Sequence, residues 1–207
     1  MRYRPFGKTG EDISVLGFGC MRLPEYEKDG KWYIDEDKAI PMLHRAFEKG
    51  VNYYDTAPFY CHSNSEITLG KAMKDRRDKV LLSTKSPVGD IKETAQYRKF
   101  LEQSLKKMDT DYIDFYHFWG INKKCFDDVI LKLDLLGEAA KAKEEGLIRY
   151  ISFSFHDAPP NIQYIIDTAE QYGVPLETML VQYSLLDRGC EDMIAYAVSK
   201  GLGVVAM

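Results

Sequence analysis

The sequence predicts an α/β protein of the (β/α)8 TIM-barrel type, truncated after strand 7 and preceded by an N-terminal β-hairpin. Short β-branched and aromatic runs alternate with stretches of helical periodicity, which is typical of βαβ units and a parallel sheet. No GxGxxG sequence joins the first strand to its helix, which argues against a doubly wound dinucleotide-binding sheet. The chain has 207 residues, whereas a closed barrel typically needs about 250.

The first elements along the chain are a hairpin and a strand that carries glycines. Arg2–Val15 alternates around a glycine turn at residues 7–10, as a small hairpin does. Val15–Cys20 follows as a strand, and glycine near a strand end often marks close approach of a ligand or another backbone. Ile34–Gly50 has the apolar spacing of a helix, with Pro41 expected in its first turn, where a missing N–H is tolerated.

The later elements alternate regularly between strand and helix. Strands are expected at Val51–Tyr54, Val80–Lys85, Tyr112–Trp119, Leu147–Phe153, Thr178–Tyr183 and Gly203–Met207. Helices are expected at Ser65–Met73, Tyr97–Met108, within Phe126–Glu145, and at Asn161–Tyr172 and Glu191–Lys200. A seventh strand without a neighbour would leave a long parallel strand edge exposed, which soluble proteins avoid. We therefore expect either that the chain is a truncated product or that self-association or a partner covers this edge.

Composition places the chain among ordinary globular proteins and excludes several classes of function. With 45% hydrophobic and 29% charged residues, residues 1–207 are expected to form one domain. The net charge of -4 provides no basic surface for nucleic acid or for an anionic membrane. No apolar run approaches the roughly 18 residues of a membrane helix. The four widely spaced cysteines form no CxxC pair, which indicates a cytoplasmic protein without a metal site.

The candidate catalytic residues follow two neighbouring strands. Asp55 ends the Val51 run, which Pro58 terminates, and Tyr60 lies on the loop just beyond. Lys85 ends the Val80 run. Because the carboxyl ends of parallel strands meet at one rim, we expect the carboxylate, the phenol and the ammonium to lie together there.

Several segments together resemble the aldo-keto reductases, in order and along the whole chain. They are Arg4–Gly10 (RPFGKTG), Leu16–Pro24 (LGFGCMRLP), Asn52–Ala57 (NYYDTA) with Tyr60, Ser83–Lys85 (STK), Asp111–Asp114 (DYID) and Gly146–Tyr150 (GLIRY). The opening GFGCMRL and the stretch Ser152–Asp157 (SFSFHD) are most similar to the prokaryotic branch that carries a carboxy-terminal iron–sulfur region. That region, the eighth strand and the basic loop that grips the adenosine phosphate of NADP are absent here, so no iron–sulfur cluster is expected in this chain.

The resemblance implies an NADP- or NAD-dependent oxidoreductase that reduces a small carbonyl substrate with a tetrad of Asp, Tyr, Lys and His. Asp55, Tyr60 and Lys85 match three members of the tetrad by position. Tyr60 would donate the proton to the carbonyl oxygen. Since a free phenol has a pKa near ~10, the Lys85 ammonium would be needed to assist it, and Asp55 would orient that ammonium.

The fourth member of the tetrad is where this sequence departs from the family. Trp119 occupies the position of the histidine, and His117 lies two residues earlier. Positions two apart share one face of a strand, so His117 is expected in the barrel interior, one step deeper. Either His117 replaces the missing donor, or the site lacks that donor and Trp119 shapes the substrate pocket.

At the positions where the resemblance implies cofactor contacts, this sequence matches the family less completely than at the catalytic positions. The backbone of Gly19, Cys20 and Met21 would contact the ribose and pyrophosphate, beside Asp55. Ser154 matches a serine that contacts the nicotinamide amide. Leu180 occupies the place of a glutamine common in relatives, and Gln182 follows two residues later.

Two other functions remain open on the sequence. A shortened, catalytically impaired barrel could bind a nucleotide or a partner without turnover. A barrel hydrolase could instead pair Asp55 with a second carboxylate, for which Asp157 and Asp187 are the candidates.

Overall fold

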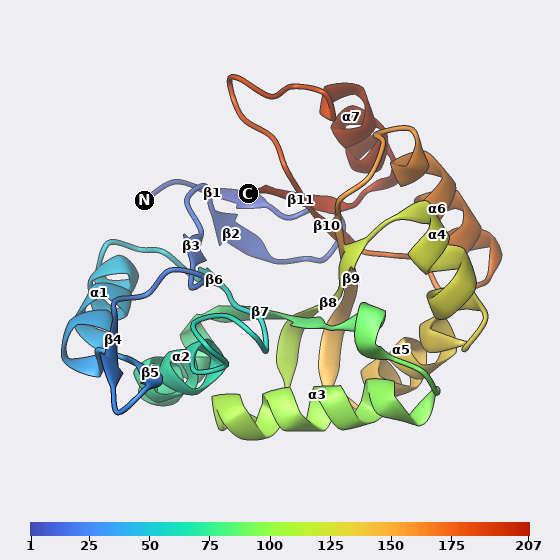
Figure 1. Ribbon diagram of the computed structural model, residues 1–207. Coiled ribbons are helices and arrows are strands. Elements are labelled where there is room, and N and C mark those ends of the chain that lie inside the picture. Colours follow the sequence, from blue (N-terminus) through green and yellow to red (C-terminus); the bar gives the residue numbers. More distant parts are fainter.

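The structure, a computed structural model, describes residues 1–207 and contains a curled sheet of seven parallel strands with helices along its outer side (Figure 1). The strand order is β11-β10-β9-β8-β7-β6-β3. The strands are β3 (Phe18–Gly19), β6 (Tyr53–Asp55), β7 (Leu81–Ser86), β8 (Ile113–Ile121), β9 (Ile148–Phe155), β10 (Thr178–Val181) and β11 (Gly203–Ala206). The predicted fold class is confirmed, as a half-barrel whose outer strands are β3 and β11.

The main helices agree with the predicted positions, except for the short α4, which was not predicted. They are α1 (Glu36–Glu48), α2 (Ser65–Met73), α3 (Ala95–Met108), α4 (Lys123–Cys125), α5 (Leu135–Glu144), α6 (Asn161–Gln171) and α7 (Glu191–Lys200). Short irregular helices add η1 (Lys74–Lys79), η2 (Val88–Asp90) and the π-helical η3 (Phe126–Leu131). None of the helices is both long enough and apolar enough to cross a membrane.

The helix predicted within Phe126–Glu145 is present as α5, and the residues before it form the separate π-helical η3. Asp134 has a left-handed backbone, with φ of 52°, and separates η3 from α5. Its carboxylate accepts a hydrogen bond from the Gly137 N–H at 3.1 Å and so starts a new helix. The sequence pattern alone did not locate the residue at which this helix begins.

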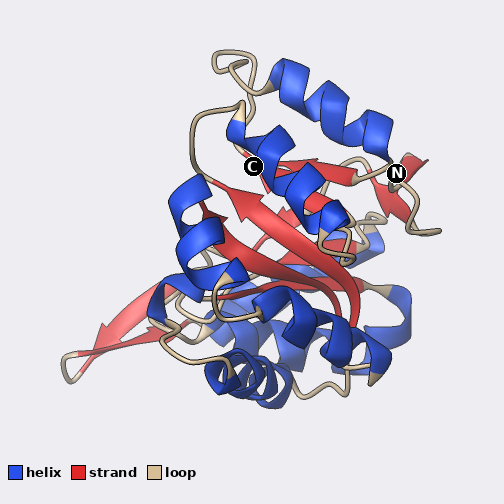
Figure 2. Cartoon of the chain, turned by 90° about the vertical axis from the view of Figure 1, so that its right-hand side faces the viewer, coloured by secondary structure: helices blue, strands red, loops and turns tan.

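A second hairpin, not predicted from the sequence, occupies residues 25–34, and its last strand ends at Ile34, where a helix was expected to begin. β4 (Glu25–Lys28) pairs with β5 (Lys31–Ile34), and Figure 2 shows the pair projecting from the body. Asp29 and Gly30 form its turn with φ of 53° and 72°, as a type I′ turn requires. Because α1 begins only at Glu36, Pro41 lies in its second turn and not in the first.

The first hairpin closes the end of the barrel that is formed by the amino ends of the strands. β1 (Tyr3–Pro5) pairs with β2 (Asp12–Ser14), as predicted. Phe6, in the turn between them, packs edge-on against Phe115 at 5.2 Å and against Tyr53 at 6.1 Å, measured between ring centres. This apolar layer fills the interior near the hairpin, so the polar interior residues lie toward the carboxyl ends of the strands.

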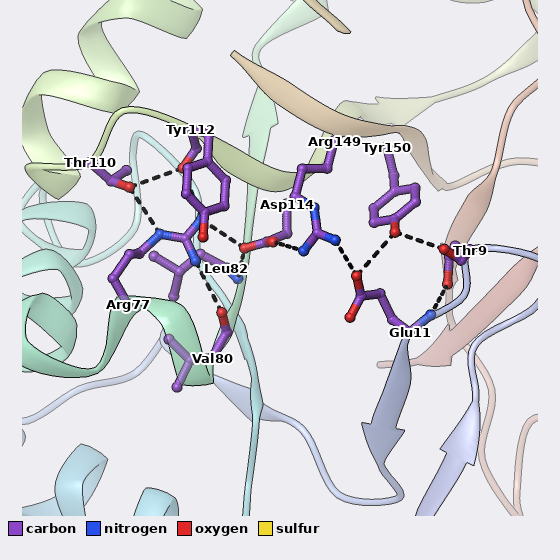
Figure 3. A network of polar contacts seen from close by, with 10 residues as sticks. All are labelled: Thr9, Glu11, Arg77, Val80, Leu82, Thr110, Tyr112, Asp114, Arg149 and Tyr150. Carbon is purple, nitrogen blue, oxygen red and sulfur yellow. Dashed lines mark hydrogen bonds and ion pairs between the residues drawn. The ribbon is translucent and has the colours of Figure 1, made fainter. Parts of the chain in front are cut away.

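A polar network joins the same hairpin to three barrel strands (Figure 3). Asp114 is fully buried at the start of β8, where it pairs with Arg77 and Arg149, each at 2.8 Å. Arg149 also pairs with Glu11, and the Tyr150 hydroxyl donates to the Thr9 carbonyl at 2.8 Å. The hairpin is therefore fixed by both apolar packing and charge.

Candidate active site

The candidate site lies at the carboxyl ends of β6, β7 and β8, where strand register brings the predicted residues together. Asp55 pairs with Ser83, and Lys85 pairs with His117. Alternation along a strand gives Ser83 and Lys85 the same face, which is the barrel interior. The sequence folds this way because β7 is a continuous buried run that is covered on both faces.

Lys85 is a buried ammonium with a defined set of partners. Only 1% of its side chain is exposed, and its Nζ lies 2.6 Å from Asp55 Oδ2. The same nitrogen donates to the Thr56 carbonyl at 2.6 Å. Ser83 donates to the second Asp55 oxygen at 2.8 Å. The charge is thus compensated and fixed in direction, as a buried ion pair requires.

Tyr60 lies directly against this ion pair. The Lys85 Nζ is 4.8 Å from the centre of the Tyr60 ring. Trp119 packs at right angles to the Tyr60 ring, with ring centres 5.7 Å apart. Asp55, Tyr60 and Lys85 therefore form one cluster, as the sequence predicted.

The segment that follows Tyr60 is held by the β4–β5 hairpin. Cys61, His62 and Ser63 all have left-handed backbones, with φ of 50°, 52° and 69°. His62 stacks on Trp32 at 5.3 Å between ring centres and hydrogen bonds to Glu25 at 2.8 Å. Successive left-handed residues are unfavourable without glycine, so these contacts stabilise a strained turn beside the site.

His117 occupies the interior next to Lys85, one step deeper than Trp119. It is 1% exposed, and neither of its ring nitrogens has a hydrogen-bond partner. Burial lowers the pKa of the imidazole to about 4, so His117 is neutral at physiological pH. Orphaned buried nitrogens of this kind are unusual in proteins and fit a polar ligand bound at the site.

The predicted backbone contact for a cofactor lies at the rim beside Asp55. Gly19 pairs with Asp55, and the Cys20 N–H donates to the Asp55 carbonyl at 2.8 Å. A Cβ on Gly19 would meet nothing within 4 Å, so its open side can admit a ligand. Burial raises the pKa of the Cys20 thiol, which makes it an inert packing group, and Met21 is exposed.

Ser154 and Gln182, the two residues predicted to contact the nicotinamide amide, lie in different surroundings. Ser154 is buried at the carboxyl end of β9, and its Oγ accepts from the Gly120 N–H at 2.7 Å. The Ser154 hydroxyl proton therefore remains free to donate to a carboxamide. Gln182 is exposed and donates to Asp187 at 3.0 Å, so the structure does not join it to the Lys85 cluster. The Ser154 hydroxyl and the open side of Gly19 are therefore groups with a contact still available to a ligand.

Two contributors to the cluster were missed on the sequence. Ser83 is two residues before Lys85, so strand alternation could have identified it. The Thr56 carbonyl is a backbone group, and no side-chain pattern could have indicated it.

The carboxylates considered for a hydrolase lie in other surroundings. Asp157 accepts from the Lys123 N–H and from Asn161, each at 2.8 Å. Asp187 is engaged with Gln182. The charged partner of Asp55 is Lys85, so the paired-carboxylate arrangement is not formed.

Comparison with known proteins identifies related chains. The model of the Aldo/keto reductase family matches residues 15–207. L-galactose dehydrogenase of Arabidopsis thaliana is 29% identical over 212 residues, covering 98% of this chain and 63% of that protein. The uncharacterised oxidoreductase YqkF of Bacillus subtilis is 30% identical over 215 residues, covering 100% of this chain and 64% of that protein.

Solved structures share the fold. An aldo-keto reductase of Bacillus halodurans in its holo form matches with a TM-score of 0.81 and 30% identity, covering 100% of this chain and 65% of that one. A thermostable aldo-keto reductase in complex with the inhibitor epalrestat matches with a TM-score of 0.82 and 28% identity, covering 100% and 72%. The chain spans about three fifths of the length of the two curated relatives above.

Proposed function

The chain belongs to the aldo/keto reductase family, and from this premise we propose that it is an NAD(P)H-dependent oxidoreductase that reduces an aldehyde or a ketone. The observation that carries the proposal is the buried Lys85 ammonium, which is paired with Asp55 at 2.6 Å and lies against the Tyr60 ring. The resemblance assigns catalytic roles to these three residue types, and the geometry brings them together.

In the proposed reaction, Tyr60 is the general acid. Its phenol donates a proton to the oxygen of the bound carbonyl, which becomes the hydroxyl of the product alcohol. Lys85 stabilises the phenolate that remains, because a positive charge nearby favours the ionised form of a phenol. Asp55 holds the ammonium in place, and Ser83 holds Asp55. Such acid–base assistance is typically worth ~10²–10⁴-fold in rate.

We assign the cofactor to the rim at the carboxyl ends of the strands, from β3 to β9. When bound, the reduced nicotinamide supplies the hydride for carbonyl reduction. Ser154 would donate to its carboxamide, and the backbone of Gly19, Cys20 and Met21 would contact its sugar and phosphates. Gln182 would have to exchange its contact with Asp187 in order to reach the same group.

We assign the fourth catalytic position to His117 and the pocket wall to Trp119. His117 adjoins Lys85 and is neutral, so one of its ring nitrogens can donate a hydrogen bond to the substrate oxygen. Trp119 contacts both Tyr60 and Phe59, at 5.7 Å between ring centres in each case. It would therefore limit the size of the carbonyl compound beside the phenol.

The alternative is a catalytically impaired barrel that binds a nucleotide or a partner without turnover. The observation that favours it is Trp119 itself, because its ring occupies space beside Tyr60. For either function we propose that self-association or a partner covers the outer strands β3 and β11, and that the protein is cytoplasmic, as its free cysteines suggest.

The test is a titration of the protein with NADPH and with NADH, followed by quenching of tryptophan fluorescence, together with an aldehyde-reduction assay. We expect saturable quenching, because Trp119 lies at the site, and turnover that falls by ~10²–10⁴-fold in Tyr60→Phe. Tyr26→Phe, on the exposed hairpin, is the matched control and should retain activity. Binding without turnover would support the impaired barrel, and folded protein that binds neither cofactor would refute the proposed reductase.

A further inference from the structure

Glu66 is a buried carboxylate that the proposed reaction does not use. It lies on α2 and is 1% exposed. Its Oε1 accepts from the Thr84 hydroxyl at 2.7 Å, on the strand that carries Lys85. Burial of a carboxylate costs free energy unless a cation compensates its charge. The role of Glu66 therefore depends on which cation it pairs with.

The counter-ion is Lys107, near the carboxyl end of α3. Its Nζ lies 3.3 Å from Glu66 Oε2. The same nitrogen donates to the Pro58 carbonyl at 3.2 Å. One ammonium thus connects α3 and α2 to the loop that leads to Tyr60.

The loop between Asp55 and Tyr60 is held by two ammonium groups. Lys85 binds the Thr56 carbonyl from inside the barrel, and Lys107 binds the Pro58 carbonyl from the helix layer. Pro58 has no N–H, so its carbonyl is its one backbone hydrogen-bonding group. Within the loop, the Tyr60 N–H donates to Ala57 at 3.2 Å, so the Lys107 contact at Pro58 lies next to the turn that orients the phenol.

We propose that Lys107 is a positioning residue for carbonyl reduction: anchored by Glu66, it fixes the Pro58 carbonyl and so holds Tyr60 against Lys85. This inference rests on the proposed function, because it assigns Lys107 to the same site. Lys107 does not touch the reacting atoms. Loss of the Lys107 ammonium should shift the position of the Tyr60 ring. It should leave the proposed cofactor contacts of Gly19 and Ser154 unchanged.

The experiment compares Lys107→Met with Lys107→Arg and with Lys106→Met. Lys106 is the neighbouring exposed lysine on α3, so Lys106→Met removes the same charge from the same helix. Because small misplacement of a catalytic group can cost about 10²-fold, we expect kcat of Lys107→Met to fall by ~10- to 100-fold. The cofactor dissociation constant should change by less than about twofold, and Lys107→Arg should recover most of kcat by restoring a donor to Pro58.

A second measurement does not depend on turnover. 3-Fluorotyrosine placed at position 60 alone gives one ¹⁹F signal, whose shift and width report the surroundings of that ring. We expect this signal to move or broaden in Lys107→Met and to remain unchanged in Lys106→Met.

The inference is overturned if Lys107→Met matches Lys106→Met in both kcat and the ¹⁹F signal, or if Lys107→Arg recovers neither. If the unsubstituted protein shows no turnover, the proposed reductase fails. The ¹⁹F comparison then still decides whether Lys107 positions Tyr60.

Discussion

His117 is a buried imidazole beside a buried ammonium, and no protein group satisfies its nitrogens. Both burial and the Lys85 charge oppose its protonation, and burial is the larger cause, although Asp55 favours it. The neutral ring can donate from one nitrogen and accept at the other. The same environment that makes it a candidate donor also makes it a source of acid sensitivity.

The pKa of His117 predicts how stability depends on pH. The folded pKa is about 4, below the ordinary value of 6.5, so the unfolded chain binds more protons between these values. The free energy of unfolding should therefore fall as the pH drops through this window, by on the order of 3 kcal/mol. Urea unfolding at several pH values should show this loss in the natural protein and not in His117→Gln. Parallel pH curves for the two proteins would contradict the prediction.

The candidate site could be predicted in part from single residues. Asp55, Tyr60 and Lys85 were identified because each follows or ends a recognisable apolar run, and the structure brings them into one cluster. Gln182 was named by its offset from Leu180, but its actual partner is Asp187, a loop contact that sequence spacing does not encode. Lys107 was not identified on the sequence, since no local pattern links it to Pro58.

At the scale of elements, the buried strands, the long helices and the first hairpin were predicted, whereas the second hairpin was not. The continuous buried run of β7 indicates a strand, and the apolar residues of α3 recur at helical spacing, so each segment was assigned correctly. The β4–β5 hairpin was missed because its strands are largely exposed and carry little apolar alternation. Its signal was the Asp29-Gly30 pair, which specifies a type I′ turn.

The break at Asp134 gives a prediction for the η3–α5 element. Asp134 is left-handed and caps α5, and its carboxylate also accepts from the Tyr172 hydroxyl at 2.8 Å. Asp134→Ala should lower the free energy of unfolding by about 1–2 kcal/mol, since it loses the cap and retains an unfavourable backbone.

Urea unfolding would measure this effect, with Asp134→Asn as the control. Asparagine tolerates the left-handed region and can still accept the hydrogen bond, so it should be nearly neutral. Equal destabilisation by Asn and Ala would argue against a role for the cap.

At the scale of the whole molecule, the network around Asp114 joins segments that are far apart in the sequence (Figure 3). Its carboxylate satisfies two arginines and the Leu82 N–H, at 2.8 Å in each case. Removing its charge leaves Arg77 and Arg149 without their buried counter-ion. Asp114→Asn should therefore destabilise the fold by roughly 3–5 kcal/mol.

The matched variant is Glu11→Gln, which removes the partly exposed end of the same network. It should cost less than about 1 kcal/mol, because exposed ion pairs contribute little. Thermal and urea unfolding would compare the two variants. An effect of Asp114→Asn no larger than that of Glu11→Gln would show that the centre of the network does not stabilise the barrel.

The position of the first hairpin also sets the order in which the chain can complete its structure. The Lys8 N–H donates to the Gly201 carbonyl, and Phe6 packs where any side chain on Gly203 would have to lie. The first hairpin therefore contacts residues that lie nearly two hundred positions later in the sequence. At about 5–20 residues per second, that interval is roughly 10–40 s. Until β11 has been synthesised, the aromatic layer of Phe6, Tyr53 and Phe115 lacks the Gly203 backbone that packs against Phe6.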